Sequence, residues 1–161
     1  MSKEKLIKTN AMRILDSKKI SYEMISYPCN DGQIDGISVA RKIGEEEIRV
    51  FKTLVAQGGS KEIYVYVIPV AEELDLKKSA IITKEKKIEM IHAKDILKYT
   101  GYIRGGCSPI GLKRNYKIFV HESAKYLDYI IFSAGKIGYQ IKMKPLDLLD
   151  IVDGKFEDLI K

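Results

Sequence analysis

The fold is decided by a stretch with two apolar arms, which reads Val50-Phe51-Lys52-Thr53-Leu54-Val55-Ala56, then Gln57-Gly58-Gly59-Ser60, then Ile63-Tyr64-Val65-Tyr66-Val67-Ile68-Pro69-Val70. β-Branched and aromatic residues dominate both arms, as is typical of strands that pack in a sheet. The glycines between the arms supply the backbone freedom that a tight connection needs. We therefore expect strands over Phe51–Ala56 and Ile63–Val70, joined as an antiparallel hairpin.

Short elements of both kinds flank this hairpin. Apolar spacing and turn residues predict, upstream, a helix from Leu6 to Leu15 that ends near Asp16-Ser17, a strand over Tyr22–Tyr27, a loop over Pro28–Gly36 and a helix over Ile37–Ile43 that Gly44 ends. Downstream they predict helices over Leu76–Ile82, Ala93–Tyr99, Pro145–Val152 and Phe156–Ile160, and strands over Lys117–His121, Tyr129–Ser133 and Tyr139–Met143. This irregular interleaving predicts a single α+β domain over residues 1–161, with a mixed sheet wrapped by short helices.

Composition sets outer limits on function. The chain has 161 residues, 45% of them hydrophobic, which suits one ordinary globular domain. Its apolar runs are far shorter than the roughly 20 residues that span a bilayer, and its first residues have no signal-peptide core, so we expect a cytoplasmic protein with no membrane partner. The net charge of +6 favours a polyanionic partner without requiring one.

The cysteines and histidines give no sign of a metal site. Cys29 and Cys107 lie far apart, and the chain has only two histidines, His92 and His121, neither at a recognisable ligand or base spacing. We therefore expect no metal, no cofactor and no disulfide framework. Cys107 as a covalent nucleophile is disfavoured because no partner base is apparent, and both histidines are expected at the surface or at a sheet end.

A glycine-rich segment follows the predicted middle helices and reads Thr100-Gly101-Tyr102-Ile103-Arg104-Gly105-Gly106-Cys107-Ser108-Pro109-Ile110-Gly111. Glycine lets a ligand approach the main chain closely, and Pro109 fixes one turn. Free N–H groups in such a loop can hold an oxyanion or a phosphate, although a tight hairpin connection explains the same composition. Basic residues gather around the segment, among them Lys94, Lys98, Arg104, Lys113 and Arg114.

Lys52 is out of place inside the first arm of the hairpin. Strand alternation puts it on the same side as Val50 and Leu54, where an unpaired ammonium is costly to bury. Lys52 therefore either faces a pocket that receives an anion or lies on the solvent side of an edge strand.

Three separated motifs together resemble the YbaK/EbsC family of aminoacyl-tRNA deacylases. They are Val50-Phe51-Lys52-Thr53-Leu54, the segment Gly105-Gly106-Cys107-Ser108-Pro109-Ile110-Gly111 after Thr100-Gly101-Tyr102, and Phe132-Ser133-Ala134-Gly135-Lys136-Ile137-Gly138. The resemblance covers essentially the whole chain and implies a curved sheet like that of the editing domain in prolyl-tRNA synthetases. It implies an enzyme that removes cysteine from mischarged Cys-tRNA(Pro), and also from Cys-tRNA(Cys), with the tRNA 3′ end and prolyl-tRNA synthetase as partners.

The resemblance also implies a role for individual residues. Lys52 would hold the terminal adenosine through its phosphate and sugar oxygens, and Gly105 and Gly106 would offer backbone contacts to the aminoacyl ester. The remaining positions of the implied substrate pocket are Tyr27, Cys107, Ser108, Pro109, Ser133, Gly135, Gly138 and Gln140.

Two positions depart from the family pattern. Cys107 replaces an aliphatic residue, and Gln140 stands where relatives often carry an aspartate. Because an amide cannot take a proton at neutral pH, Gln140 cannot serve as a base. The family mechanism needs none, since the substrate thiol attacks its own ester and forms a thiolactone. Hydrolysis of Ala-tRNA(Pro) by water, and a noncatalytic module that binds tRNA or a synthetase, remain the alternatives.

Overall fold

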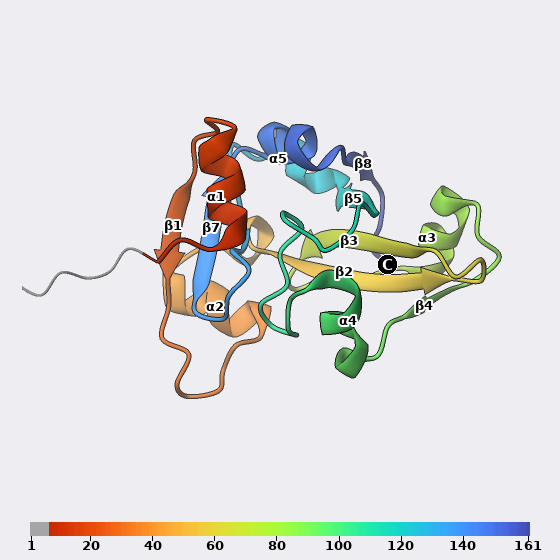
Figure 1. Cartoon of the computed structure of the whole chain (residues 1–161), viewed down its shortest axis with the longest axis horizontal. Helices are drawn as coiled ribbons and strands as arrows, with labels where there is room; N and C mark the ends of the chain where they lie inside the picture. The colour runs from red at the N-terminus through yellow and green to blue at the C-terminus, as the bar shows by residue number, and fades with distance from the viewer. Residues whose placement is uncertain (1–6) are drawn as a thin grey trace, which may run out of the picture.

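The computed structural model describes residues 7–161, and within them the strands form two sheets (Figure 1). The smaller sheet is antiparallel with the strand order β1-β7-β6, and the larger one has the order β4-β2-β3-β5-β8. The strands are β1 (Glu23–Ser26), β2 (Phe51–Gly58), β3 (Ile63–Pro69), β4 (Ile88–Met90), β5 (Lys117–His121), β6 (Ile130–Ser133), β7 (Tyr139–Met143) and β8 (Lys155–Glu157). The α-helices are α1 (Asn10–Ser17), α2 (Gly36–Ile43), α3 (Leu76–Thr83), α4 (Ile96–Thr100) and α5 (Pro145–Val152).

The predicted hairpin is confirmed and forms the centre of the larger sheet. Strands β2 and β3 pair antiparallel, with Lys52 opposite Ile68. Every residue of β3 is buried, as expected of a central strand whose two faces are both covered. Strand β5 pairs with β3 in parallel, so this sheet is mixed, and the predicted α+β class is confirmed.

A single bridge joins the two sheets. Val50, just before β2, pairs in parallel with Ile131 of β6, and both residues are almost fully buried. Beyond this bridge the two strands run in the same direction but belong to different sheets. Phe51 and Phe132 lie in the same buried cluster, so the core is continuous at this junction. Figure 1 shows α1 lying beside β7, where α1 buries Met12 and Leu15.

Helix α2 follows its sequence signals closely. The Asp35 side chain accepts a hydrogen bond from the Ser38 backbone N–H at 3.1 Å, which satisfies one donor of the first turn. Gly44 ends the helix with φ of +70°, a left-handed conformation that favours glycine. The prediction of a helix between a polar loop and Gly44 is confirmed.

Two sequence predictions differ from the structure at the chain ends. The helix predicted over Phe156–Ile160 is wrong, because Phe156 lies in β8 and pairs in parallel with Val120 of β5. The apolar spacing of this short segment suits a helix equally well, and the open edge of β5 decides in favour of a strand. The first helix begins at Asn10, capped by Thr9, and Leu6 lies outside the described residues.

The middle of the chain also holds more pieces than the sequence predicts. Strand β4 was not predicted, since it has only three residues and follows a lysine-rich turn. The single helix predicted over Ala93–Tyr99 is divided into a 3-10 turn over Ala93–Asp95 and the short helix α4.

Candidate functional site

A cavity of about 610 Å³ lies where β2 and β6 diverge beyond the bridge between the two sheets. Its volume falls within the range of small-molecule sites. The walls come from the loop before α2, from β2, from the segment around α4, from the glycine-rich segment, and from the facing ends of β6 and β7. The polar and glycine positions that line it are Asp35, Gly36, Lys52, Thr53, Arg104, Gly105, Cys107, Ser133 and Gln140.

Lys52 lines this cavity as a half-buried cation. Within residues 7–161 no carboxylate lies within ion-pair distance of its amine. Burial lowers the pKa of Lys52, while Glu73 and Glu72 oppose that shift from longer range. A cation that is partly desolvated and not directly paired is well placed to receive an anionic ligand.

The glycine-rich segment offers its main chain to the same cavity. Gly105 has φ of +85°, and a Cβ at this position would meet Ile34 Cδ1 at 2.8 Å. Gly106 donates its N–H to the Ile103 carbonyl at 3.0 Å. Gly105 and Cys107 donate their N–H groups to no acceptor within the described part of the chain, and both line the cavity. These two amides are candidates for binding a developing oxyanion.

Side chains hold this segment in its open conformation. The Tyr102 hydroxyl donates to the Ile110 carbonyl at 2.6 Å, and the Ile110 N–H donates to Ser108 Oγ at 3.2 Å. Ser108 is fully buried, and Pro109 next to it is also buried. These hydrogen bonds connect residues within the glycine-rich segment, so the segment has a defined conformation and is not a simple hairpin turn.

Cys107 contributes an apolar wall to the cavity. The residue is 7% exposed, and burial raises the pKa of its thiol to about 11. The thiol is therefore protonated at neutral pH, whereas a nucleophilic cysteine needs a lowered pKa. The geometry agrees with the expectation that Cys107 is not the nucleophile.

Ser133 and Gln140 face each other across β6 and β7 and close the far side of the cavity. Ser133 Oγ accepts a hydrogen bond from the Gly135 N–H at 3.1 Å, which leaves its own proton free to donate. Gln140 is only 6% exposed and lines the cavity. Its amide can donate and accept hydrogen bonds and so orient a polar ligand, but it cannot remove a proton.

The other predicted site residues are not among those that line the cavity. These are Tyr27, Gly106, Ser108, Pro109, Gly135 and Gly138. The Tyr27 N–H donates to the Gly138 carbonyl at 2.9 Å, and the buried Tyr27 hydroxyl has no partner among the described residues. Gly135 has φ of +97°, and a Cβ there would meet the Tyr102 ring at 2.8 Å.

Some residues that line the cavity were not predicted from the sequence. Thr53 lies next to Lys52 and lines the cavity, and its buried Oγ1 has no hydrogen-bond partner among the described residues. Adjacency to Lys52 was the available signal for Thr53. Ile34 and Asp35 come from a loop that the sequence predicts only as a connection, and nothing local to them indicates a site.

The basic residues noted in the sequence lie beside this cavity. The Lys113 N–H donates to the Thr100 carbonyl at 3.0 Å, and the Tyr116 hydroxyl donates to the Tyr99 carbonyl at 2.6 Å, so residues 111–116 are held against α4. Within residues 7–161, the cations of this surface make no ion pair; they are Lys94, Lys98, Arg104, Lys113 and Arg114. A surface of uncompensated cations attracts a polyanion.

Residues 7–161 show neither a metal-binding cluster nor a helix that could span a membrane. They contain no group of three histidine, cysteine, aspartate or glutamate side chains arranged to hold a metal ion. None of the helices in this part of the chain is both long enough and apolar enough to cross a membrane.

Comparison with known proteins links this site to tRNA chemistry. The profile of a family described as the aminoacyl-tRNA editing domain matches residues 35–151, a range that contains all three sequence motifs. EbsC of Enterococcus faecalis, which carries the name of a Cys-tRNA(Pro)/Cys-tRNA(Cys) deacylase, is 43% identical over 152 residues, 94% of this chain and 93% of that protein. A proline–tRNA ligase of Caldicellulosiruptor bescii is 30% identical over 117 residues, which are 73% of this chain and 20% of the ligase.

A solved structure shares the fold. It is described as a trans-editing enzyme for prolyl tRNA synthetase, and it superposes with a TM-score of 0.83 at 18% identity, covering 96% of this chain and 99% of that one. At this identity the match speaks for the architecture alone, which includes both sheets.

Proposed function

The chain belongs to the family of aminoacyl-tRNA editing domains, and from this premise we propose that it is a deacylase that removes cysteine from mischarged Cys-tRNA(Pro) and from Cys-tRNA(Cys). The observation that carries the proposal is that Lys52 lines the same cavity as Gly105 and Cys107, whose N–H groups have no acceptor among the described residues. The relative EbsC supports the choice of cysteine through its name and through its identity over nearly the whole chain.

The proposed reaction needs no protein nucleophile. The cysteinyl thiol sulfur attacks its own ester carbonyl, the new carbon–sulfur bond closes a thiolactone, and the bond to the tRNA 3′ oxygen breaks. The thiol proton ends on that oxygen by way of solvent. Holding thiol and carbonyl together in a fixed conformer can supply several kcal/mol of the barrier lowering.

Each polar group of the cavity has a role in this reaction. The Lys52 amine binds the phosphate and sugar oxygens of the terminal adenosine, and the N–H groups of Gly105 and Cys107 bind the oxyanion as it forms. The amide of Gln140 and the hydroxyl of Ser133 orient the sugar hydroxyl or the amino group of the substrate. Chemistry performed by the substrate also favours specificity, because a pocket separates side chains that differ by one methylene by only about 1–3 kcal/mol.

The surroundings of the cavity support a tRNA substrate. The basic surface formed by Lys94, Lys98, Arg104, Lys113 and Arg114 lies beside the opening, where the acceptor arm would continue from the bound 3′ end. We include in the proposal that residues 1–161 act as one domain, that the reaction takes place in the cytoplasm, where charged tRNA is found, and that prolyl-tRNA synthetase delivers the substrate.

The test is a deacylation assay with purified protein on Cys-tRNA(Pro), Cys-tRNA(Cys) and Ala-tRNA(Pro), following loss of the ester against a buffer control. We expect rapid loss of both cysteinyl esters and trapping of the released thiolactone by a thiol reagent. Selective loss of the alanyl ester would instead identify an Ala-tRNA(Pro) hydrolase. Decay at the buffer rate on all three, with tRNA binding retained, would identify a noncatalytic binding module.

A further inference from the structure

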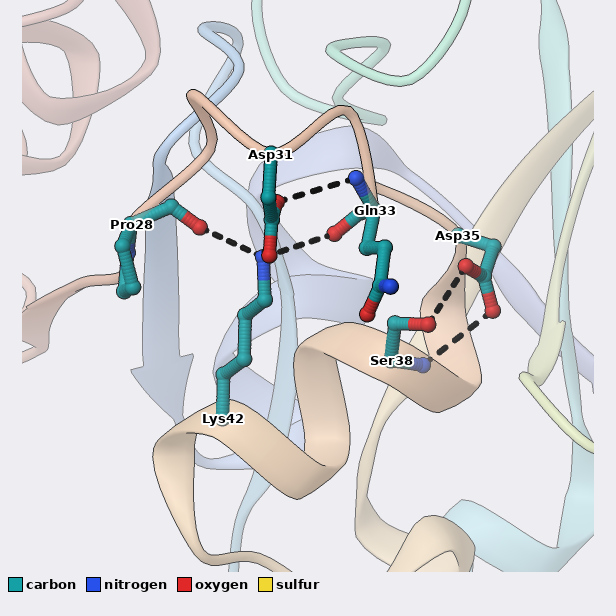
Figure 2. A network of polar contacts seen from close by, with 6 residues as sticks. All are labelled: Pro28, Asp31, Gln33, Asp35, Ser38 and Lys42. Carbon is teal, nitrogen blue, oxygen red and sulfur yellow. Dashed lines mark hydrogen bonds and ion pairs between the residues drawn. The ribbon is translucent and has the colours of Figure 1, made fainter.

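Lys42 fastens the loop that forms one wall of the cavity. This loop, residues 28–35, connects β1 to α2, and Figure 2 shows the Lys42 side chain reaching from α2 up into it. The Lys42 amine donates to the Pro28 carbonyl at 2.6 Å, to Asp31 Oδ1 at 2.7 Å and to the Gln33 carbonyl at 3.0 Å. Three acceptors match the three protons of an ammonium, so this hydrogen-bonding group is fully used.

The same loop is tied at other points. Asp31 Oδ1 also accepts the Gln33 N–H at 3.0 Å, and Asp35 caps α2 through both the N–H and the hydroxyl of Ser38. The Lys42 side chain is 14% exposed, whereas that of Asp31 is 46% exposed. Lys42 is thus less exposed than its carboxylate partner, and its removal would release the loop between its ends.

The loop acts on the cavity through Ile34. Ile34, Asp35 and Gly36 all line the cavity, and Ile34 Cδ1 lies against Gly105, within 2.8 Å of the position that a Cβ would occupy there. A side chain from the loop therefore closes the cavity beside one of the two free backbone amides. The position of this wall determines how large an acyl group fits next to the oxyanion position.

From this arrangement we propose that Lys42 is a positioning residue that sets the size limit of the acyl pocket by holding residues 28–35, and thereby Ile34, against the glycine-rich segment. The inference rests on the proposed deacylase function. Lys42 touches neither the reacting ester nor the tRNA in this account; it acts only through the loop.

The test compares Lys42→Met with Lys42→Arg, and with Lys8→Met as a matched control. Lys8 also forms an ion pair, at 2.7 Å to Asp16, but it is not among the residues that line the cavity. The measured quantity is kcat/KM for a cysteinyl ester relative to a homocysteinyl ester on the same tRNA, because homocysteine keeps the attacking thiol and is larger by one methylene. We expect Lys42→Met to lower this selectivity about 10-fold, Lys42→Arg to restore it to within about twofold, and Lys8→Met to leave it unchanged.

A second measurement does not depend on activity. Hydrogen exchange of the amides in residues 28–35 should become at least about 10-fold faster in Lys42→Met and should stay slow in Lys42→Arg. Asp31→Asn, which weakens one of the three contacts and keeps the side-chain volume, should have an intermediate effect in both assays.

The outcomes separate this inference from the proposed function. A wild-type protein that cleaves the cysteinyl ester, together with unchanged selectivity and unchanged exchange in Lys42→Met, would refute the role of Lys42 alone. If the wild-type protein cleaves no ester faster than the buffer control, the proposed function is refuted, and the role of Lys42 in the acyl pocket is refuted with it.

Discussion

The burial of Cys107 makes a prediction about stability that can be worked out in numbers. Its thiol has a pKa raised to about 11 by desolvation, against a reference of 9.0 in an unfolded chain. The folded state therefore holds the thiol proton more tightly than the unfolded state does. The resulting stability is fully present below pH 9 and is lost as the pH rises toward 11, because there the unfolded state alone has released its proton.

The size of the effect follows from the shift. Two pKa units at 1.36 kcal/mol each give about 3 kcal/mol in total, of which about 2 kcal/mol should be lost by pH 10.5. Other groups titrate in the same range, since burial also raises the pKa of Tyr66 and of Tyr102 to about 12. Cys107→Ala keeps both tyrosines, so the difference between wild type and variant reports the thiol together with its electrostatic effect on Tyr102.

The assay is urea unfolding of wild type and Cys107→Ala at pH 7.5, 9 and 10.5. At pH 7.5 the variant should be less stable by about 1–2 kcal/mol, since the removed sulfur leaves a small cavity. At pH 10.5 this gap should close or reverse. Deacylation by the variant should stay within a few-fold of wild type. A difference in unfolding free energy that is constant with pH, or an inactive variant that folds normally, would refute the interpretation of Cys107 as a buried, neutral residue in the cavity wall.

Two further predictions concern the glycine-rich segment and the surface beside it. Gly105→Ala should lower the free energy of unfolding by about 1–2 kcal/mol, because alanine is strained at φ of +85° and its Cβ would displace Ile34. The kcat/KM for deacylation should fall as well. An unchanged unfolding midpoint in urea would contradict this geometry. Reversing two surface charges, Lys98→Glu with Arg114→Glu, should raise the KM for aminoacylated tRNA and make that KM less dependent on salt. A minimal aminoacylated adenosine, which lacks the acceptor arm, should be cleaved as fast as by wild type. Equal losses on both substrates would show that the charges act on the fold instead.

The sequence predicts the fold best where local signals agree with the tertiary contacts. The hairpin, α2 with its Gly44 cap, and α5 beginning at Pro145 all combine apolar spacing with the expected end residues. The segment at Phe156 fails this rule, because its spacing permits a helix and only the open edge of β5 selects a strand. The way the two sheets meet depends on one bridge, Val50 with Ile131, for which no local pattern exists.

The candidate site shows the same contrast between residues that nearby sequence indicates and residues whose role depends on contacts far apart in the chain. A lysine in a strand and a cluster of glycines are unusual in themselves, but it was the family resemblance that implied a site at Lys52, Gly105 and Cys107; the structure places all three on one cavity. Ile34 was missed because its role arises from contact with Gly105, which is far away in the chain. The network around Lys42 is equally invisible in sequence, since its acceptors include two backbone carbonyls.

The central claim is that the half-buried Lys52 cation holds the acylated tRNA end in the cavity between the two sheets. Single-turnover deacylation of Cys-tRNA(Pro) by Lys52→Met, with Lys8→Met as the control, tests it most directly. We expect Lys52→Met to lose about 100-fold in kcat/KM, or about 3 kcal/mol, with an unfolding free energy at least equal to that of wild type, since the substitution removes the burial of a charge. A Lys52→Met protein that cleaves the ester as fast as the control would contradict the account.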